Sequence, residues 1–121
     1  MRDKMSERFL EFAVSIIKLG KQLNKTFEGQ HIYKQLFRAG SSSGANFEES
    51  HSAESTKDFI HKRGIVLKEL RESLFWSKLI SKSSLISKDD HTLTFLIQEN
   101  NELINIIAKS LATIKKNQLK K

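Results

Sequence analysis

The chain has 121 residues, no cysteine, no proline and a formal net charge of +7 at pH 7. The length suits one domain with one core, and the missing cysteine excludes disulfides, thiolate catalysis and cysteine-ligated zinc or iron–sulfur centres. The missing proline favours an all-helical chain, and since no apolar run approaches the roughly 20 residues of a membrane span, we expect a cytoplasmic protein without membrane contact.

The first predicted helix runs from about Ser6 to Asn24. Its apolar residues recur at spacings of three and four, the period of one helix face: Phe9, Phe12, Ala13, Ile16 and Leu23. Asn24 and the segment from Thr26 to Gly29 predict the end of this helix.

The second predicted helix runs from about Gln30 to Glu49, although its centre is the linker-like run Gly-Ser-Ser-Ser-Gly. One stripe of apolar or small residues stays in phase across that run: Ile32, Leu36, Ala39, Ser43 and Phe47. A flexible linker would have no reason to keep this phase. Gly40 and Gly44 form a G-x-x-x-G pair, which lowers one face so that a neighbouring backbone can approach, at about 1 kcal/mol of helix propensity for each glycine.

The third predicted helix begins after Ser55 and runs to about Lys82. The sequence Ser55-x-x-Asp58 is a capping box at its start. One broad face is apolar: Phe59, Ile60, Val66, Leu67, Leu70 and Leu74. Ion pairs at i,i+4 are expected on the solvated side, for Asp58–Lys62 and Lys68–Glu72.

A second face of the same helix is basic. At about 100° per residue its members fall on one line: Lys57, His61, Lys68, Arg71, Lys78 and Lys82. The line is about 37 Å long at 1.5 Å per residue, enough to follow several phosphates of RNA or DNA. Phe75 lies on it and could stack a base. The alternative is that these are the ordinary surface lysines of a basic protein.

A third face of this helix carries a separate apolar set. We predict that Ile65, Trp76 and Ile80, bordered by Glu69, form a subunit interface anchored by Trp76. The alternative is that Trp76 folds down beside a neighbouring helix.

The fourth predicted helix starts at a cap supplied by Asp89 or Asp90. Its seam repeats at spacings of three and four over three heptads: Leu93, Leu96, Asn100, Ile104, Ile107, Leu111 and Ile114. The polar Asn100 is expected to fix the register of the helix. Near the end, Lys115 and Lys116 suit the helix dipole and could also add salt-sensitive affinity for nucleic acid.

Two acid-x-x-His spacings, Glu48 to His51 and Asp58 to His61, match the pattern of di-iron carboxylate bundles. The further glutamates of such a site would have to be Glu11, Glu99 or Glu102, and none of them lies in the middle of an apolar seam. The serine run has no nucleophile-elbow motif and lacks the Gly-Lys-Ser/Thr of a phosphate loop. We therefore expect no metal, no cofactor and no enzyme activity.

The stretches QLFRAGSSSGANFEES and SAESTKDFIHKRGIVLKELRESLFW resemble the signature of the bacterial four helix bundle protein family. That family includes proteins encoded in intervening sequences of large-subunit ribosomal RNA genes and the accessory variability determinant of diversity-generating retroelements. Many members have Asn-Ile-Ala-Glu-Gly where this chain has Asn46 to Ser50, so a glycine is missing at the bend. The matching residues are Gln35, Arg38, Ala45, Asn46, Glu49, Ser55, Asp58, Phe59, Glu69 and Glu72.

The resemblance implies an antiparallel up-down-up-down four-helix bundle, formed by residues 1–121 as a single domain. It also implies a ring-shaped homopentamer with a basic surface, nucleic-acid binding, and a protein partner such as a reverse transcriptase. We expect a non-enzymatic oligomeric bundle that binds the backbone of RNA or DNA. The alternative is a protein–protein interaction scaffold or accessory subunit with no direct nucleic-acid contact.

Overall fold

The computed structural model describes the backbone of residues 2–119 and the side chains of residues 3–119. This part of the chain is helical and contains no strand. The helices are α1 (Arg2–Leu23), α2 (Phe27–Ser50), α3 (Thr56–Ser83) and α4 (His91–Leu119). The all-α prediction is confirmed, and the first three helices begin and end, and α4 begins, within a few residues of the bounds expected from the sequence.

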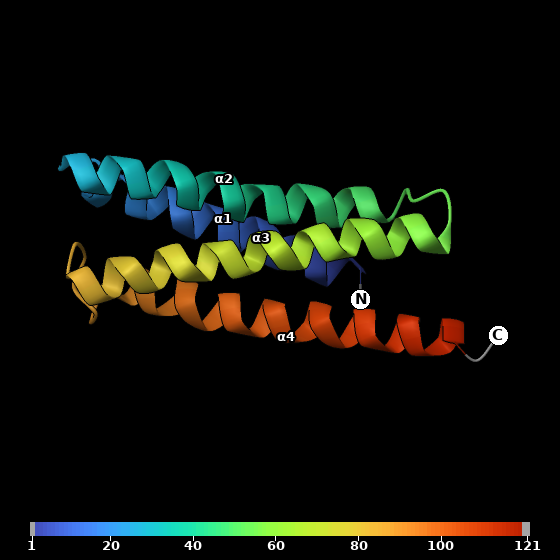
Figure 1. The fold of residues 1–121 in the computed structure, drawn as a ribbon. Helices are drawn as coiled ribbons and strands as arrows, with labels where there is room; N and C mark the ends of the chain where they lie inside the picture. Colours follow the sequence, from blue (N-terminus) through green and yellow to red (C-terminus); the bar gives the residue numbers. More distant parts are fainter. Residues whose placement is uncertain (1, 120–121) are drawn as a thin grey trace.

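Neighbouring helices run antiparallel (Figure 1). Between two antiparallel helices, the residue numbers in contact rise along one helix as they fall along the other. The contacts follow this pattern between α2 and α3 (Arg38–Glu69 and His31–Trp76), between α3 and α4 (Arg63–Ser110 and Leu70–Asn100), and between α1 and α4 (Arg8–Glu99 and Gln22–Asp90). Helix α1 contacts α2 and α4 but not α3, so α1 and α3 are diagonal. The predicted up-down-up-down bundle is confirmed.

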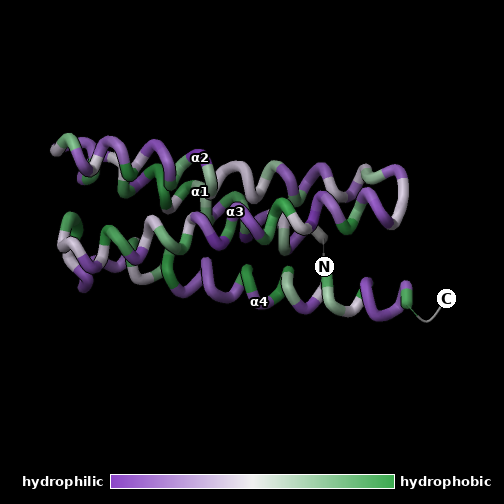
Figure 2. Tube along the Cα trace, viewed as in Figure 1, coloured by the Kyte–Doolittle hydropathy of each residue, from purple (hydrophilic) through white to green (hydrophobic). Residues whose placement is uncertain are grey.

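One apolar core runs between the four helices. Figure 2 shows apolar and polar residues alternating along each helix, as expected when only one side of a helix is buried. The largest fully buried side chains are Phe12, Ile16, Leu19, Leu23, Leu36, Leu70, Ile80, Ile86, Leu93, Leu96, Leu103 and Ile107. Among residues 2–119, no helix is long and apolar enough to cross a membrane.

The Gly-Ser-Ser-Ser-Gly run lies in the middle of α2 and is helical. A Cβ atom at Gly40 would lie 2.2 Å from Cδ1 of Ile16, and one at Gly44 would lie 3.3 Å from Cβ of Phe9. The buried hydroxyl of Ser43 donates to the Gly40 carbonyl at 2.7 Å, so it needs no partner from another helix. The small residues therefore let α1 pack directly against α2, as predicted.

Helices α2, α3 and α4 each begin at a side-chain cap. In each case the side-chain oxygen accepts a hydrogen bond from the backbone N–H three residues on: Thr26 from Gly29 (2.9 Å), Ser55 from Asp58 (3.0 Å) and Asp90 from Leu93 (2.9 Å). The predicted cap at Ser55 is confirmed, and Asp90 rather than Asp89 caps α4.

Asn100 is fully buried in the seam of α4. Its Nδ2 atom donates a 2.8 Å hydrogen bond to the backbone carbonyl of Leu70 in α3. A shift of either helix by one turn would break this hydrogen bond and leave the buried amide of Asn100 without an acceptor for its N–H group. Asn100 therefore favours one register of α4 against α3, in line with the role predicted for it.

Candidate nucleic-acid interface

The basic stripe of α3 is exposed along its whole length. Its six members are all exposed: Lys57, His61, Lys68, Arg71, Lys78 and Lys82. None of them forms an ion pair with a carboxylate of residues 3–119. The positive charges of its lysine and arginine side chains are therefore not consumed by intramolecular pairing and remain available to an anionic partner.

An aromatic ring lies among these cations. Phe75 is 59% exposed, and its ring packs edge-on against Trp76 with centroids 5.0 Å apart. This contact holds the ring of Phe75 at the surface, as a base-stacking role would require.

Arg38 of α2 bridges to α3 beside the stripe. Its Nη1 atom lies 3.1 Å from Oε2 of Glu69, and its Nη2 atom contacts Glu72. The indole nitrogen of Trp76 also donates to Glu72, at 3.0 Å. The hydrogen bond from Arg38, followed by that from Trp76, holds the pKa of Glu72 below its ordinary value. The negative charge of Glu72, which would weaken the positive stripe, is thus balanced by Arg38 of α2.

The two expected i,i+4 ion pairs have different outcomes. Asp58 and Lys62 form theirs at 3.5 Å, as predicted. Lys68 does not pair with Glu72, because that carboxylate binds Arg38 instead. Lys68 acts on Glu72 only as a weaker Coulombic attraction, and so it stays available on the stripe.

The predicted oligomer interface on α3 is wrong at two of its four residues. Ile80 is fully buried in the core of its own bundle, and Glu69 is buried against Arg38. Ile65 and Trp76 are half-buried, and the ring of Trp76 lies edge-on to His31 of α2. The reason is that α2 packs on this side of α3. The alternative reading, in which the indole folds down beside a neighbouring helix, is the better description.

The large exposed apolar line lies on α1 instead. Leu10, Val14 and Ile17 are 60%, 41% and 50% exposed, and spacings of four and three place them on one face. These three residues lie outside the core stripe predicted for this helix. The same periodicity would have revealed this second line.

The remaining family-motif residues shape α2 and its connection to α3. Asn46 donates from Nδ2 to the Ser42 carbonyl at 2.9 Å, Gln35 is half-buried and Glu49 is exposed. The ring of Phe59 lies 4.4 Å from the guanidinium carbon of Arg63. The C-cap of α2, His51, has ordinary right-handed backbone angles, so the bend needs no glycine.

Lys115 and Lys116 are exposed in the last turns of α4. Because α4 runs antiparallel to α3, with Ser110 opposite Arg63, these lysines lie at the end of the bundle where α3 and its stripe begin. They can extend the positive surface at that end.

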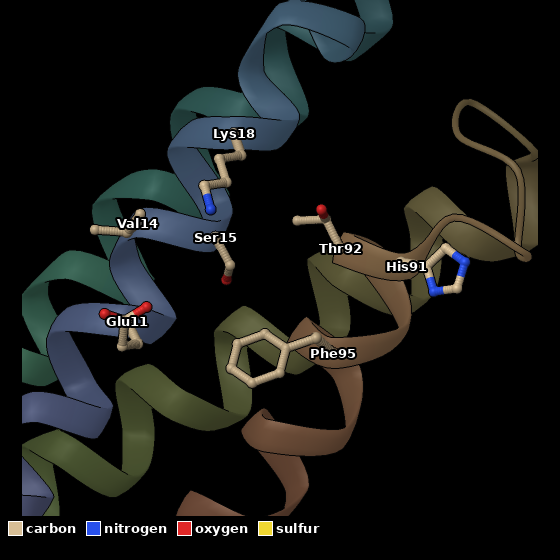
Figure 3. A pocket seen from close by; sticks show the side chains of 7 residues that line it. All are labelled: Glu11, Val14, Ser15, Lys18, His91, Thr92 and Phe95. Carbon is tan, nitrogen blue, oxygen red and sulfur yellow. The ribbon is translucent and has the colours of Figure 1, made fainter.

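A cleft of about 290 Å³ lies between α1 and α4 and is lined by polar and apolar side chains, Val14 and Phe95 among them (Figure 3). Ser15 and Thr92 point toward the gap, whereas His91 is turned away from α1. The Ser15 hydroxyl donates a hydrogen bond to the Phe12 carbonyl of its own helix at 2.6 Å. Ser15 and His91 are therefore not placed as a nucleophile and its base. Among the described residues there is no group of three or more His, Asp or Glu side chains that could hold a metal ion.

The sequence pattern of 23S rRNA-intervening sequence proteins matches residues 3–112 of the chain. The chain belongs to this family. It is also similar to a crystal structure of a protein of unknown function from the S23 ribosomal protein family, from Bacteroides thetaiotaomicron. The two are 32% identical over 88% of this chain and 96% of that one, with a TM-score of 0.78. No curated protein matches the chain. Membership of the 23S rRNA-intervening sequence proteins agrees with the resemblance found in the sequence.

Proposed function

We propose that this 23S rRNA-intervening sequence protein is a non-enzymatic cytoplasmic bundle that binds the backbone of RNA or DNA through the basic stripe of α3. The observation that carries the proposal is that Lys57, Lys68, Arg71, Lys78 and Lys82 are exposed on one helix and unpaired within residues 3–119. RNA is the first ligand to test, because the family is named for intervening sequences of 23S rRNA.

The stripe would bind by charge rather than by base sequence. Lysine and arginine contacts to phosphate release condensed counterions, so affinity falls steeply as salt rises. If each of the five lysine and arginine side chains contacts one phosphate of a duplex, affinity should fall roughly 500-fold between 50 mM and 200 mM salt. Phe75 would add stacking where the ligand is single-stranded.

The test is a filter-binding titration of a structured RNA at those two salt concentrations, with two variants of equal net charge. Lys68→Glu with Lys78→Glu reverses the stripe and should weaken binding by more than about tenfold. Lys4→Glu with Lys21→Glu reverses exposed lysines of α1, which does not contact α3, and should have a much smaller effect.

Three results would contradict the proposal. They are no binding at low salt, binding that does not respond to salt, and equal losses in the two variants. The last result would mean that net charge alone, and no particular surface, governs the affinity.

A second candidate function is an interaction scaffold, and the exposed line Leu10, Val14 and Ile17 on α1 favours it. We propose that a second copy of the chain covers this line, in the homopentamer that the family resemblance implies. Such a ring would bring several basic stripes near one axis and multiply weak contacts. A reverse transcriptase is the further partner that the resemblance suggests.

Light scattering tests self-association directly. The wild type should have several times the 13.9 kDa mass of one chain, and Leu10→Glu with Ile17→Glu should reduce it to one chain. Phe27→Glu, at a position 81% exposed in the first turn of α2, is the control and should leave the assembly intact. A monomeric wild type would overturn the proposed self-association. It would leave the filter-binding test of the stripe unaffected.

A further inference from the structure

Three arginines lie between helices, and they differ in how their charge is balanced. Arg8 pairs with Glu99 and Glu102, and Arg38 pairs with Glu69 and Glu72. Arg63 of α3 is only 8% exposed, yet no carboxylate of residues 3–119 lies within 4.0 Å of it. Buried charges in proteins are normally paired, so Arg63 is the exception that needs an explanation.

Neutral groups hold the guanidinium of Arg63 in place. Its Nε atom donates to Oγ of Ser50 at 2.8 Å, and its Nη1 atom lies 3.5 Å from Oγ of Ser110. Its central carbon is 4.6 Å and 4.4 Å from the ring centroids of Phe47 and Phe59. These contacts fix the orientation of the group but bring no negative charge, and burial lowers the pKa of Arg63.

A pocket of about 320 Å³ opens beside this guanidinium. It lies where α1 begins and α2 ends, and its wall has two parts. Arg63, Ser110 and His51 supply polar groups, whereas Met5, Phe47, Ile106 and Ile107 supply an apolar surface. A ligand that matches both parts would carry one anionic group and a short apolar body.

We propose that this pocket binds a small organic monocarboxylate, with the carboxylate on Arg63 and the apolar body against Met5, Ile106 and Ile107. A guanidinium presents its N–H groups as a fork that matches the two carboxylate oxygens. One cation balances one carboxylate, whereas a phosphate dianion would keep an unbalanced charge in a largely apolar pocket. The volume lies at the small end of the range for ligand pockets.

This site is distinct from the basic stripe. Arg63 is buried between the helices, whereas the stripe residues are exposed on the outside of α3. Ligand binding in the pocket can therefore be measured without nucleic acid, and its failure would not bear on the proposed function.

The probe is hexanoate, and the reporter is the methyl group of Met5 in protein labelled with ¹³C-methyl methionine. The chain has two methionines, so Met1 provides an internal reference signal. At constant ionic strength and about pH 7, where a carboxylate is ionised, hexanoate should shift the Met5 signal saturably. Hexanamide, which has the same shape without the charge, and inorganic phosphate should both bind at least about tenfold more weakly.

Arg63→Leu should weaken hexanoate binding at least about tenfold, and Arg63→Lys should have an intermediate effect because lysine keeps the charge but loses the fork. Arg38→Leu removes one arginine elsewhere and should leave binding unchanged. Should Arg63→Leu fail to fold, the Arg63→Lys variant and the comparison of hexanoate with hexanamide still decide the question.

Several outcomes would overturn the inference. Absence of a saturable Met5 shift with hexanoate would do so, as would equal binding of hexanamide. Tighter binding of phosphate than of hexanoate would overturn the carboxylate as ligand class. Hexanoate binding that survives Arg63→Leu would remove the role given to Arg63.

Discussion

Arg38 of α2 and Glu69 of α3 form a 3.1 Å ion pair between residues 31 positions apart in the sequence. The same arginine contacts Glu72, which also accepts a hydrogen bond from Trp76. This cluster joins α2 to α3 and turns inward a side of α3 that the sequence pattern had suggested was an outer surface.

Glu72 should contribute to acid sensitivity. Its hydrogen bonds to Arg38 and then to Trp76 lower its pKa below the ordinary 4.5, so its stabilising effect is complete above that pH. The effect is lost as the pH falls through the lower native pKa. Glu72→Gln should therefore reduce the free energy of unfolding by about 0.5–1 kcal/mol at neutral pH. The difference from wild type should shrink as the pH falls below 4.5.

Urea unfolding at a series of pH values would measure this change. Glu49→Gln is the control, because Glu49 is exposed and forms no ion pair within residues 3–119. A constant difference between Glu72→Gln and wild type at every pH would contradict the explanation.

Loss of Arg8 should destabilise the contact between α1 and α4. Its Nε and Nη2 atoms bind both oxygens of Glu99, at 2.9 Å and 2.6 Å, and the Glu99 side chain is only 9% exposed. Arg8→Leu would leave that carboxylate buried without its partner, lowering the free energy of unfolding by about 2 kcal/mol. Adding Glu99→Gln should restore part of the loss, and a double-mutant cycle by urea unfolding would show it. Strictly additive effects would contradict this coupling.

Two helical glycines should respond in opposite directions to the same substitution. A Cβ atom at Gly29 would lie 1.8 Å from the backbone oxygen of Leu23, whereas one at Gly64 would meet nothing within 4 Å. Gly29→Ala should lower the free energy of unfolding by about 1–3 kcal/mol. Gly64→Ala should raise it by about 0.5–1 kcal/mol, because alanine favours the helix. Thermal or urea unfolding would compare them, and a stabilised Gly29→Ala would show that the start of α2 can shift.

Lys115 and Lys116 should contribute less to nucleic-acid binding than the stripe. Neutralising both to Gln should make the logarithmic salt dependence shallower by at most about two contacts. The affinity should stay above that of the variant with Lys68 and Lys78 reversed. Filter binding over a range of salt would measure both quantities. A larger loss from the tail than from the stripe would shift the main binding surface to the end of α4.

The sequence predicts the helices well because its signals are local. The stripe of α2 stays in phase through Gly40 and Gly44, and the caps at Ser55 and Asp90 act within three residues of themselves. Most of the seam of α4, including the buried Asn100, follows from its regular spacing, although Leu103 rather than Ile104 is the buried residue at its turn. These features depend on one helix at a time, so periodicity and capping are sufficient to find them.

Features that depend on two helices are harder to predict. The periodicity of α3 shows on which face of the helix Ile80 lies, but not which neighbouring helix covers that face. The spacing of Arg63 from Val66 and Leu67 places it on the apolar face of α3, but its partners are not evident from the sequence, because Ser50 comes from α2 and Ser110 from α4. Arg38 belongs to the family motif, but its partners become evident only when α2 and α3 are placed side by side.

The diagonal placement of α1 and α3 has a consequence for folding kinetics. Of the helix pairs in contact within residues 2–119, α1 and α4 are the only two that do not follow one another in the chain. Bringing α1 and α4 together closes the longest loop and costs the most chain entropy, so we expect this contact to form last, after the hairpins of neighbouring helices. The ion pair between Arg8 and Glu99 should then not yet be formed in the folding transition state. Their replacement should accelerate unfolding while the refolding rate stays almost unchanged.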